Sequence, residues 1–422
     1  MVPNGWLKTN LQNYIHIKHG FAFKSEYFRE EGSYVLLTPG SFYEPGGFRN
    51  QKNKTKYYIG EIPEGYLLSK DDLLIAMTEQ GAGLLGSTLF VPENNRYLHN
   101  QRLGLIQIKS HESVCSEFLY LTYNSPYIRK QITEQSTGTK VKHTSPDRLK
   151  SVICLLPPLP EQRKIAKILS TWDKAITTTE KLIATSQQQK KALMQQLLTG
   201  KKRLLNPETG MVFEGDWEEI RLGDIAKYQK GYTYKSSEYS EKATANGFLT
   251  LKSIQRGGGY SPKGIKYLLS NVDEKFAVVK GDVVFAVTDL TRNAEVVGAP
   301  IFVPKLPFNN SYISMDLVKL QLNASVNKQF IYYSLKLPCN RNFMRARASG
   351  STVLHLDVQG SKKLKLLIPK ILQEQQKIAS VLTAADKEIE LLQAKLTHLK
   401  QEKKALMQQL LTGKKRVKSE AA

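Results

Sequence analysis

The 422-residue sequence is poor in cysteine, with only Cys115, Cys154 and Cys339. Their spacing fits no paired-cysteine metal or redox motif, so we expect buried thiols in a reducing compartment. No run of about 18 apolar residues occurs, which argues against a membrane-spanning helix. The amino-terminal segment has no apolar core like that of a signal peptide. These absences predict a cytoplasmic protein.

Acidic residues are scarce relative to basic ones. The chain has 61 Lys and Arg against 38 Asp and Glu, a formal net charge of +23. A surplus of this size repels itself unless a polyanion is nearby. Nucleic acid is the commonest such partner, because binding to phosphates releases counterions. The charge therefore favours a nucleic-acid-binding protein.

Catalytic motifs are also missing or incomplete. The stretch "GAGLLG" (Gly81–Gly86) fits G-x-G-x-x-G, but a strand-like run follows where a nucleotide site needs a helix, so we expect a glycine-rich hairpin loop. The stretch "NSPY" (Asn124–Tyr127) lacks the middle proline of the adenine-holding motif of amino-methyltransferases, and we expect a helix terminus. No P-loop and no H-E-x-x-H occurs. We predict no catalytic residue, no metal site and no cofactor of its own.

What the sequence does contain is an internal repeat. "KKALMQQLLTGKKR" occurs at 190–203 and again, without a change, at 403–416, which is 213 positions later. Upstream, "EQRKIAKILSTWDKAI" at 161–176 matches "EQQKIASVLTAADKEI" at 374–389 at the same offset. Prolines precede each copy, and Gly200 and Gly413 follow as helix stops. The repeat predicts two long, equivalent helices.

Apolar residues in both helices step by four and three, as in a coiled coil. About 39 residues at 1.5 Å each give a helix of roughly 58 Å, which needs a partner along its length. We expect the two helices to pack antiparallel on each other. The predicted seam is Ile165, Leu169, Trp172, Ile176, Ile183, Leu193, Leu197, Ile378, Leu382, Ile389, Leu392, Leu396, Leu399, Leu406 and Leu410.

The segments outside the helices repeat more faintly and in the same order. "GFAFKSEYF" at 20–28 answers "GYTYKSSEY" at 231–239, and "TGTKVKH" at 137–143 answers "SGSTVLH" at 349–355. Short runs of apolar and aromatic residues predict strands, with one helix near 116–135 and a counterpart. The expected fold class is α+β, with an internal pseudo-twofold repeat. The predicted domains are 1–158 and 204–371 (globular), 159–203 and 372–416 (helical), and 417–422 (a disordered tail).

Nucleic-acid contacts are expected from loops that carry Arg, Lys, Asn, Gln and Thr, which reach phosphates and base edges. His143 and His355 occupy equivalent places, and we favour a structural or phosphate-contact role for them. The candidates cluster at equivalent positions of the repeat. They are Lys18, Lys24, Thr78, Glu79, Gln80, Arg96, Asn100, Gln101, Arg102, Thr139, Lys140, Lys142, Lys230, Lys235, Lys252, Gln255, Arg256, Thr288, Arg292, Asn309, Asn310, Arg345, Arg347, Ser351 and Thr352.

The stretch "LLPPLPEQRKIAKILSTWDKAI" and its second copy resemble the specificity (S) subunit of type I restriction–modification systems. The resemblance extends over essentially the whole chain. The resemblance implies two target-recognition domains, each reading one half of a bipartite, asymmetric DNA target. It implies helices that set the spacer and dock two methyltransferase subunits, and restriction subunits that could join the complex. S-adenosylmethionine and ATP would belong to those partners, in a bacterial or archaeal cytoplasm. The S subunit itself is not an enzyme in such systems.

Two other functions remain compatible with the residues. One is a degenerate DNA adenine methyltransferase built around the "GAGLLG" and "NSPY" stretches, for which binding of S-adenosylmethionine by the isolated chain is the discriminating observation. The other is a coiled-coil scaffold that binds RNA or DNA, which competition between duplex DNA and RNA would test.

The "DDLLIAMTEQGAGLLG" loop of the first half matches the family pattern, whereas "GDVVFAVTDLTRNAEVVG" in the second departs from it.

Overall fold

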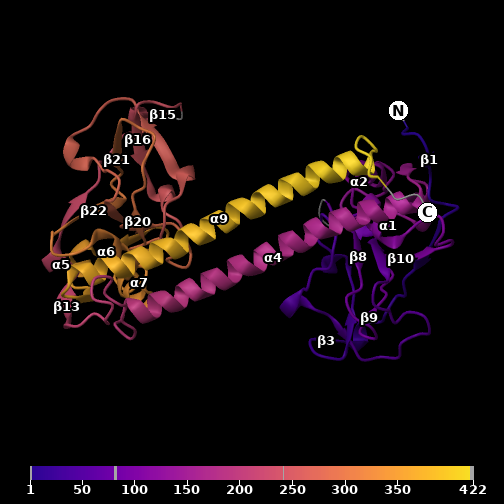
Figure 1. Ribbon diagram of the computed structural model, residues 1–422, viewed down its shortest axis with the longest axis horizontal. Helices are drawn as coiled ribbons and strands as arrows, with labels where there is room; N and C mark the ends of the chain where they lie inside the picture. Colours follow the sequence, from indigo (N-terminus) through magenta and orange to yellow (C-terminus); the bar gives the residue numbers. More distant parts are fainter. Residues whose placement is uncertain (1, 80–82, 241, 419–422) are drawn as a thin grey trace. The chain divides into compact units, whose positions relative to one another are not determined.

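A computed structural model describes residues 2–79, 83–240 and 242–418. The chain divides into two compact units (Figure 1). The first unit comprises Met1–Glu180 and Ala394–Ala422, and the second comprises Lys181–Gln393. Each is a mixture of helices and short strands, which confirms the α+β prediction. In the described part of the chain, no helix is both long enough and apolar enough to span a bilayer.

The first unit is built on two four-stranded sheets and two ribbons. One sheet is antiparallel, with the order β2 (Ile15–His19), β10 (Leu103–Ile108), β6 (Leu73–Ala76), β8 (Thr88–Phe90). The other has the order β3 (Phe28–Arg29), β5 (Tyr57–Tyr58), β4 (Tyr34–Leu36), β9 (Tyr97–Leu98), in which β4 and β9 run parallel. The ribbons pair β1 (Leu7–Thr9) with β12 (Cys154–Leu156), and β7 (Thr78–Glu79) with β11 (Lys142–His143).

The second unit repeats this topology. Its antiparallel sheet has the order β14 (Ala226–Lys230), β22 (Leu317–Leu322), β18 (Val283–Ala286), β20 (Pro300–Phe302). The other sheet has the order β15 (Tyr239–Ser240), β17 (Ile265–Leu268), β16 (Asn246–Leu249), β21 (Asn310–Ile313), again with one parallel pair. The smaller sheets pair β13 (Trp217–Arg221) with β25 (Lys365–Pro369), and join β19 (Thr288–Asp289), β24 (Leu354–Leu356) and β23 (Ala348–Ser349).

Short helices complete both units. The first unit has α1 (Ser116–Tyr123), α2 (Pro126–Glu134) and α3 (Pro146–Lys150), and the second has α5 (Leu222–Ile225), α6 (Lys328–Leu335), α7 (Pro338–Arg345) and α8 (Val358–Ser361). The 3-10 turns are Ser25–Tyr27, Pro39–Ser41, Lys52–Lys54, Ser236–Glu238, Leu251–Ser253, Pro262–Gly264 and Glu274–Phe276.

The prediction of one helix over 116–135 is wrong, because two helices meet there. Pro126 begins α2, and a proline disfavours helical conformation in the residue before it. Ser125 is accordingly extended, and its hydroxyl caps the N–H of Ile128. The "NSPY" stretch is this junction, as expected for a helix terminus. Pro338 interrupts the equivalent pair α6 and α7 in the same way.

The two long helices are α4 (Leu159–Leu197) and α9 (Leu372–Leu411), and each unit contains one end of each. In both units the two helix segments lie side by side (Figure 1). Leu410, near the end of α9, shares the first unit's core with Ile165 and Leu169, near the start of α4. Leu197 shares the second unit's core with Ile378 and Leu382. The start of one helix therefore packs beside the end of the other, so the pair is antiparallel.

The seam residues fall into two groups. Buried are Ile165, Leu169, Leu197, Ile378, Leu382, Ile389 and Leu410. Half-buried are Trp172, Ile176, Ile183, Leu193, Leu392, Leu396, Leu399 and Leu406. Lysines interrupt the apolar stepping at one equivalent place in each helix, and both are ion-paired. The ammonium of Lys403 lies 2.6 Å from the carboxylate of Asp173, and the equivalent Lys190 pairs with Asp386.

A second reciprocal contact closes the helix ends and is called here the end clasp. Glu161, at the start of α4, is buried and accepts hydrogen bonds at 2.8 Å from Nε and Nη2 of Arg416 beyond the end of α9. In the second unit, Glu374 at the start of α9 accepts equivalent bonds from Arg203 at 2.9 and 2.6 Å. Each copy of the repeated stretch supplies a Lys and an Arg to the other helix. Such reciprocity requires the same residues at these two positions of the repeated stretch.

Glu161 and Glu374 are each followed by a buried glutamine that ties the helix to its globular domain. Gln162 accepts from the N–H of Cys115 at 3.2 Å and donates to the carbonyls of Ser113 and Pro157. Gln375 accepts from the N–H of Asn327 at 2.8 Å and donates to the carbonyl of Pro369. The Glu-Gln pair therefore fixes both the opposite helix and the adjoining sheet. Of the expected disordered tail, residues 419–422 lie outside the described residues, and Val417 packs on the first unit's core.

Candidate nucleic-acid interface

A loop follows β6 and β7 in the first unit and is anchored by a buried carboxylate. Glu79 is 5% exposed, and its Oε2 accepts hydrogen bonds from the N–H groups of Gly83, Leu84 and Leu85 at 3.1, 2.8 and 2.7 Å. Expected as a nucleic-acid contact, Glu79 instead holds the loop from within. Gln80 and the first two residues of "GAGLLG" lie outside the described residues.

Asp289 occupies the equivalent place in the second unit. It is fully buried, and its carboxylate accepts from the N–H groups of Thr291, Val296 and Val297 at 2.6, 2.6 and 2.7 Å. Burial raises the pKa of Asp289, but the hydrogen bonds from Thr291, Val297 and Val296 outweigh it and leave the pKa below its ordinary value. Asp289 is therefore charged at neutral pH. The two loops differ in sequence but share one kind of anchor.

A short hairpin packs against each anchored loop. The hairpins are closed by bridges between Phe42 and Phe48, and between Ile254 and Tyr260. In the first unit, the N–H of Gly47 donates to the carbonyl of Thr88 at 2.8 Å. In the second, the N–H of Gly259 donates to the carbonyl of Pro300 at 2.9 Å. These two bonds reach the strands that follow the loops. The loops themselves also contact the hairpins, because the hydroxyl of Ser87 donates to the carbonyl of Tyr43 at 2.7 Å and the N–H of Gly257 donates to the carbonyl of Glu295 at 2.9 Å. Hairpin and loop thus form one surface in each unit.

Two arginines from the short helices, the half-buried Arg129 and the buried Arg341, support these surfaces. Arg129 on α2 donates to the carbonyls of Glu44, in the hairpin, and Gly83, in the loop. Arg341 on α7 is 3% exposed and donates to the carbonyl of Glu295 at 3.1 Å. Burial lowers the pKa of each to about 10, so both stay charged near neutral pH. The nearby carboxylates, Glu79 and Asp289 respectively, favour that charge.

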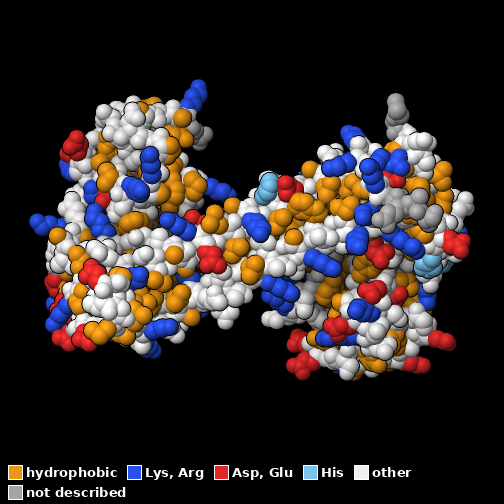
Figure 2. Space-filling view, in the orientation of Figure 1, with side chains coloured by type: hydrophobic (Ala, Val, Ile, Leu, Met, Phe, Trp, Pro, Cys, Tyr) orange, Lys and Arg blue, Asp and Glu red, His pale blue; other side chains and the backbone are white. Residues whose placement is uncertain are grey.

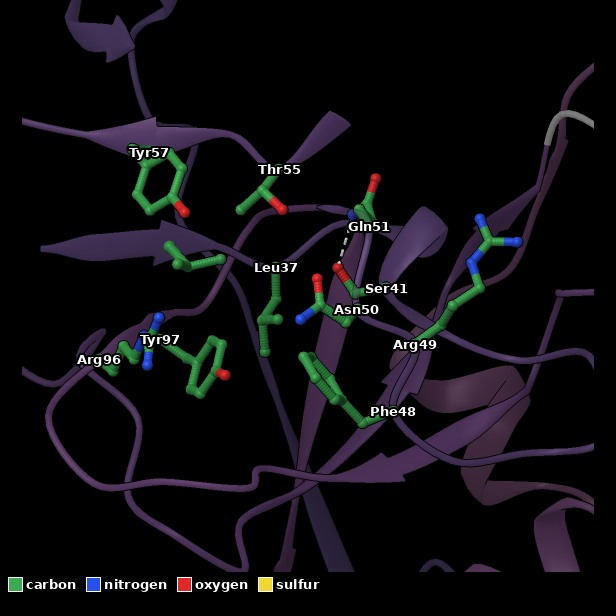
Figure 3. A pocket seen from close by; sticks show the side chains of 11 residues that line it. Leu37, Ser41, Phe48, Arg49, Asn50, Gln51, Thr55, Tyr57, Arg96 and Tyr97 are labelled. Carbon is green, nitrogen blue, oxygen red and sulfur yellow. Dashed lines mark hydrogen bonds between the residues drawn. The ribbon is translucent and has the colours of Figure 1, made fainter. Parts of the chain in front are cut away.

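The first hairpin adjoins a small hollow of about 50 Å³ (Figure 3). Gln51 points at Ser41 and donates to its hydroxyl at 2.8 Å, while Phe48 faces Tyr97 with ring centroids 5.6 Å apart. A hollow of this size has room for a few waters. Sequence reasoning missed the polar residues of its rim, Arg49 and Asn50. In the second hairpin the candidates Gln255 and Arg256 occupy the places of Tyr43 and Glu44, so the repeat gave no signal for Arg49 and Asn50.

A third repeated feature is the turn that contains each histidine. His143 pairs with Thr78 across β11 and β7, and His355 pairs with Thr288 across β24 and β19. Both imidazoles are exposed. Gly138 begins one turn at a φ of 96°, in the left-handed region that favours glycine. These turns therefore lie directly beside the start of each anchored loop.

The candidates separate by exposure. Exposed are Lys24, Arg96, Arg102, Thr139, Lys140, Lys230, Lys235, Lys252, Gln255, Arg256, Arg292, Asn309, Asn310, Ser351 and Thr352. Half-buried are Lys18, Thr78, Gln101, Lys142, Arg345 and Arg347. Glu79, Asn100 and Thr288 are buried. The side chains of this last group are shielded from solvent in this conformation, which is unfavourable for the direct contact with a duplex that was expected of them.

Several half-buried candidates are engaged within the protein. The ammonium of Lys18 donates to the carbonyl of Gly65 at 2.7 Å and lies 4.3 Å from the ring centroid of Tyr66. The guanidinium of Arg347 stacks on the ring of Phe343 at 3.4 Å. These cations add positive charge near the surface but have fixed positions. Figure 2 shows Lys and Arg side chains over both units, with Asp and Glu gathered around the β3 edge of the first.

Two α+β units of the same topology, each with one end of both long helices, place this chain among proteins with an internal repeat. Similarity to known proteins identifies the family. The family described as "Type I restriction modification DNA specificity domain" matches residues 3–185 and 214–401. The chain belongs to this family, which confirms the resemblance inferred from the repeated helix.

Individual proteins support the assignment. The MjaVIII specificity subunit of Methanocaldococcus jannaschii is 29% identical over 312 residues, 71% of either chain. The crystal structure of the S subunit from M. genitalium has a TM-score of 0.61 at 15% identity, and covers 97% of this chain and 98% of its own. A second structure, titled as a study of complex assembly in the type I R-M system, has a TM-score of 0.55 at 18% identity, with 97% and 98% covered. Both structures share the fold.

Proposed function

We propose that this chain is a DNA-specificity subunit in which each unit reads one half of a bipartite target. The observation that carries the proposal is that equivalent buried carboxylates in the two units anchor loops of different sequence. Glu79 and Asp289 hold equivalent loops of unlike sequence, and the hairpins "FYEPGGF" and "IQRGGGY" also differ. Two domains that recognise different short DNA sequences require the same loop position but different exposed side chains, because the side chains specify the bases.

The helices would serve the partners that both halves share. Their end stretches match in the two copies, 161–176 with 374–389 and 190–203 with 403–416, so one surface is presented twice and would dock two methyltransferase subunits. S-adenosylmethionine would be bound by those subunits, and ATP by any restriction subunit. Methylation would require the partner to extrude the target adenine from the stack. This chain would contribute the position and orientation of the duplex.

Co-expression with a type I methyltransferase subunit from the same genome, in a host without DNA methylation, should produce N6-methyladenine in a split motif with a fixed gap. Long-read sequencing of the host genome is the measurement. The control is the same methyltransferase without this chain, which should leave the motif unmethylated. Methylation that is unchanged when this chain is omitted would contradict the proposal.

Charge removal beside the first histidine should weaken duplex binding without changing the sequence preference. Lys140 and Lys142 lie in the turn next to β7, and we expect both to contact phosphates. For the double substitution to Gln, the slope of log K against log salt should fall by about 0.9 for each phosphate that is no longer neutralised. Fluorescence anisotropy with a cognate duplex measures this slope. Substitution of the exposed Lys70 and Lys109 removes equal charge and should leave the slope unchanged.

A further inference from the structure

The loop after β19 in the second unit is held at its base by several hydrogen bonds and an ion pair. Besides the three N–H groups bound by Asp289, the hydroxyl of Thr291 accepts from the N–H of Glu295 at 2.8 Å. The N–H of Gly257, in the neighbouring hairpin, donates to the carbonyl of Glu295 at 2.9 Å. The carboxylate of Glu295 also pairs with Arg256 at 3.3 Å. The base of the loop therefore has a fixed position relative to the hairpin.

The same loop contains a strained residue that its surroundings hold in place. Ala294 has a φ of 51°, in the left-handed region that a residue with a Cβ seldom adopts. Its carbonyl accepts from Nε of Arg345 at 2.9 Å, and Arg341 holds the next carbonyl. Strain of this kind persists only where the structure around it over-determines the conformation, and it concentrates at functional sites.

The tip of the loop, in contrast, is presented to solvent. Leu290 is 65% exposed, and Arg292 and Asn293 are exposed beside it. Among the residues that the structure describes, none forms a hydrogen bond or ion pair with the guanidinium of Arg292. An arginine, an asparagine and an apolar side chain on a rigid base match the groups that read guanine, adenine and the thymine methyl in a major groove.

We propose that Asp289 is a positioning residue that preforms Leu290–Asn293 as a base-reading tip for the half-site of the second unit. The inference rests on the proposed function and identifies the part of the second unit that discriminates bases. Because the loop is ordered before it meets DNA, little conformational entropy is lost on binding. The carboxylate acts through the backbone and does not touch the DNA.

Methylome mapping of single variants, co-expressed with the methyltransferase, tests the tip. Arg292→Ala and Asn293→Ala should each relax the preference at one or two positions of one half-site and leave the other half-site unchanged. Asp289→Asn keeps the size of the side chain but removes its charge. It should broaden the same half-site and lower the methylation rate at the cognate sequence at least ten-fold. Asp273→Asn, at another capping aspartate of the second unit, is the matched control and should behave as wild type.

Each outcome decides a separate point. If the wild-type chain directs no methylation and binds no duplex, the proposed function itself fails. If the wild type is active and Arg292→Ala with Asn293→Ala leaves the motif unchanged, the tip does not read bases. If Asp289→Asn leaves the half-site as in wild type, or relaxes both half-sites equally, the positioning role is wrong. Should Asp289→Asn not fold, Thr291→Ala removes one hydrogen bond at the base of the loop, and must broaden the same half-site.

Discussion

Replacing Gln162 with leucine is expected to destabilise the first unit by about 2–5 kcal/mol, since the change leaves buried partners without hydrogen bonds. Gln162 is fully buried and satisfies the N–H of Cys115 and the carbonyls of Ser113 and Pro157. Leucine has a similar size, so the destabilisation arises from the unpaired backbone groups rather than from a cavity. Each such group costs about 1–3 kcal/mol when it is buried and unpaired.

Hydrogen exchange, measured by mass spectrometry at increasing denaturant concentration, reports the stability of each unit separately. Strands β10 and β6 of the first unit should lose protection, while β22 and β18 of the second keep theirs. Gln375→Leu should reverse the pattern, because the equivalent glutamine binds Asn327 and Pro369 in the second unit. Gln187→Leu, on an exposed face of α4, should change neither. Equal loss of protection in both units would show that the glutamine contacts are not local.

Replacing Glu161 with glutamine should destabilise the same unit by about 1.5–3 kcal/mol, the range for hydrogen bonds to a charged group. Glu161 is 2% exposed and accepts from the indole N–H of Trp6 at 3.0 Å as well as from Arg416. A neutral amide offers one acceptor oxygen in place of two and directs an N–H group at these donors. The matched variant Glu374→Gln, opposite Arg203, should act on the second unit alone.

The end clasp also predicts a dependence on acid. Burial raises the pKa of Glu161, but hydrogen bonds from Arg416 and Trp6 outweigh it, and the pKa lies below its ordinary value. The folded protein therefore binds this proton less readily than the unfolded chain does. The stabilisation is complete above the ordinary carboxyl pKa of about 4.3 and is lost as pH falls through the lower pKa of the folded state.

Fluorescence of Trp6 in a Trp172→Phe, Trp217→Phe background, followed through unfolding at several pH values, measures this contribution. The free energy of unfolding should fall less between pH 5 and pH 3 in Glu161→Gln than in its parent, as glutamine does not titrate. An identical acid dependence in the two proteins would mean that Glu161 is not charged in the folded state.

The sequence by itself determined the architecture of this protein. The unchanged stretch ending at Arg203 and Arg416, and the four–three stepping of the apolar residues, were enough to predict two equivalent antiparallel helices. The fainter repeats outside the helices, with their short apolar runs, predicted the two α+β units. These signals are local or repetitive, so they can be seen without knowing which residues meet. The family followed from the same segments. The surplus of basic residues indicated nucleic acid as the partner, because net charge can be counted without knowing the fold.

Only the tertiary structure decided what individual residues do. Glu79 is a charged residue beside a glycine-rich stretch, so the sequence suggests a surface contact. In the structure it is buried, and its carboxylate binds the backbone of the loop. Glu161 meets Arg416 across 255 positions of sequence, a distance at which pattern gives no pairing. The hairpin near Arg49 joins the loop after β7 only when two sheets bring them together. Burial and partnership depend on segments remote in the chain, and packing alone specifies them.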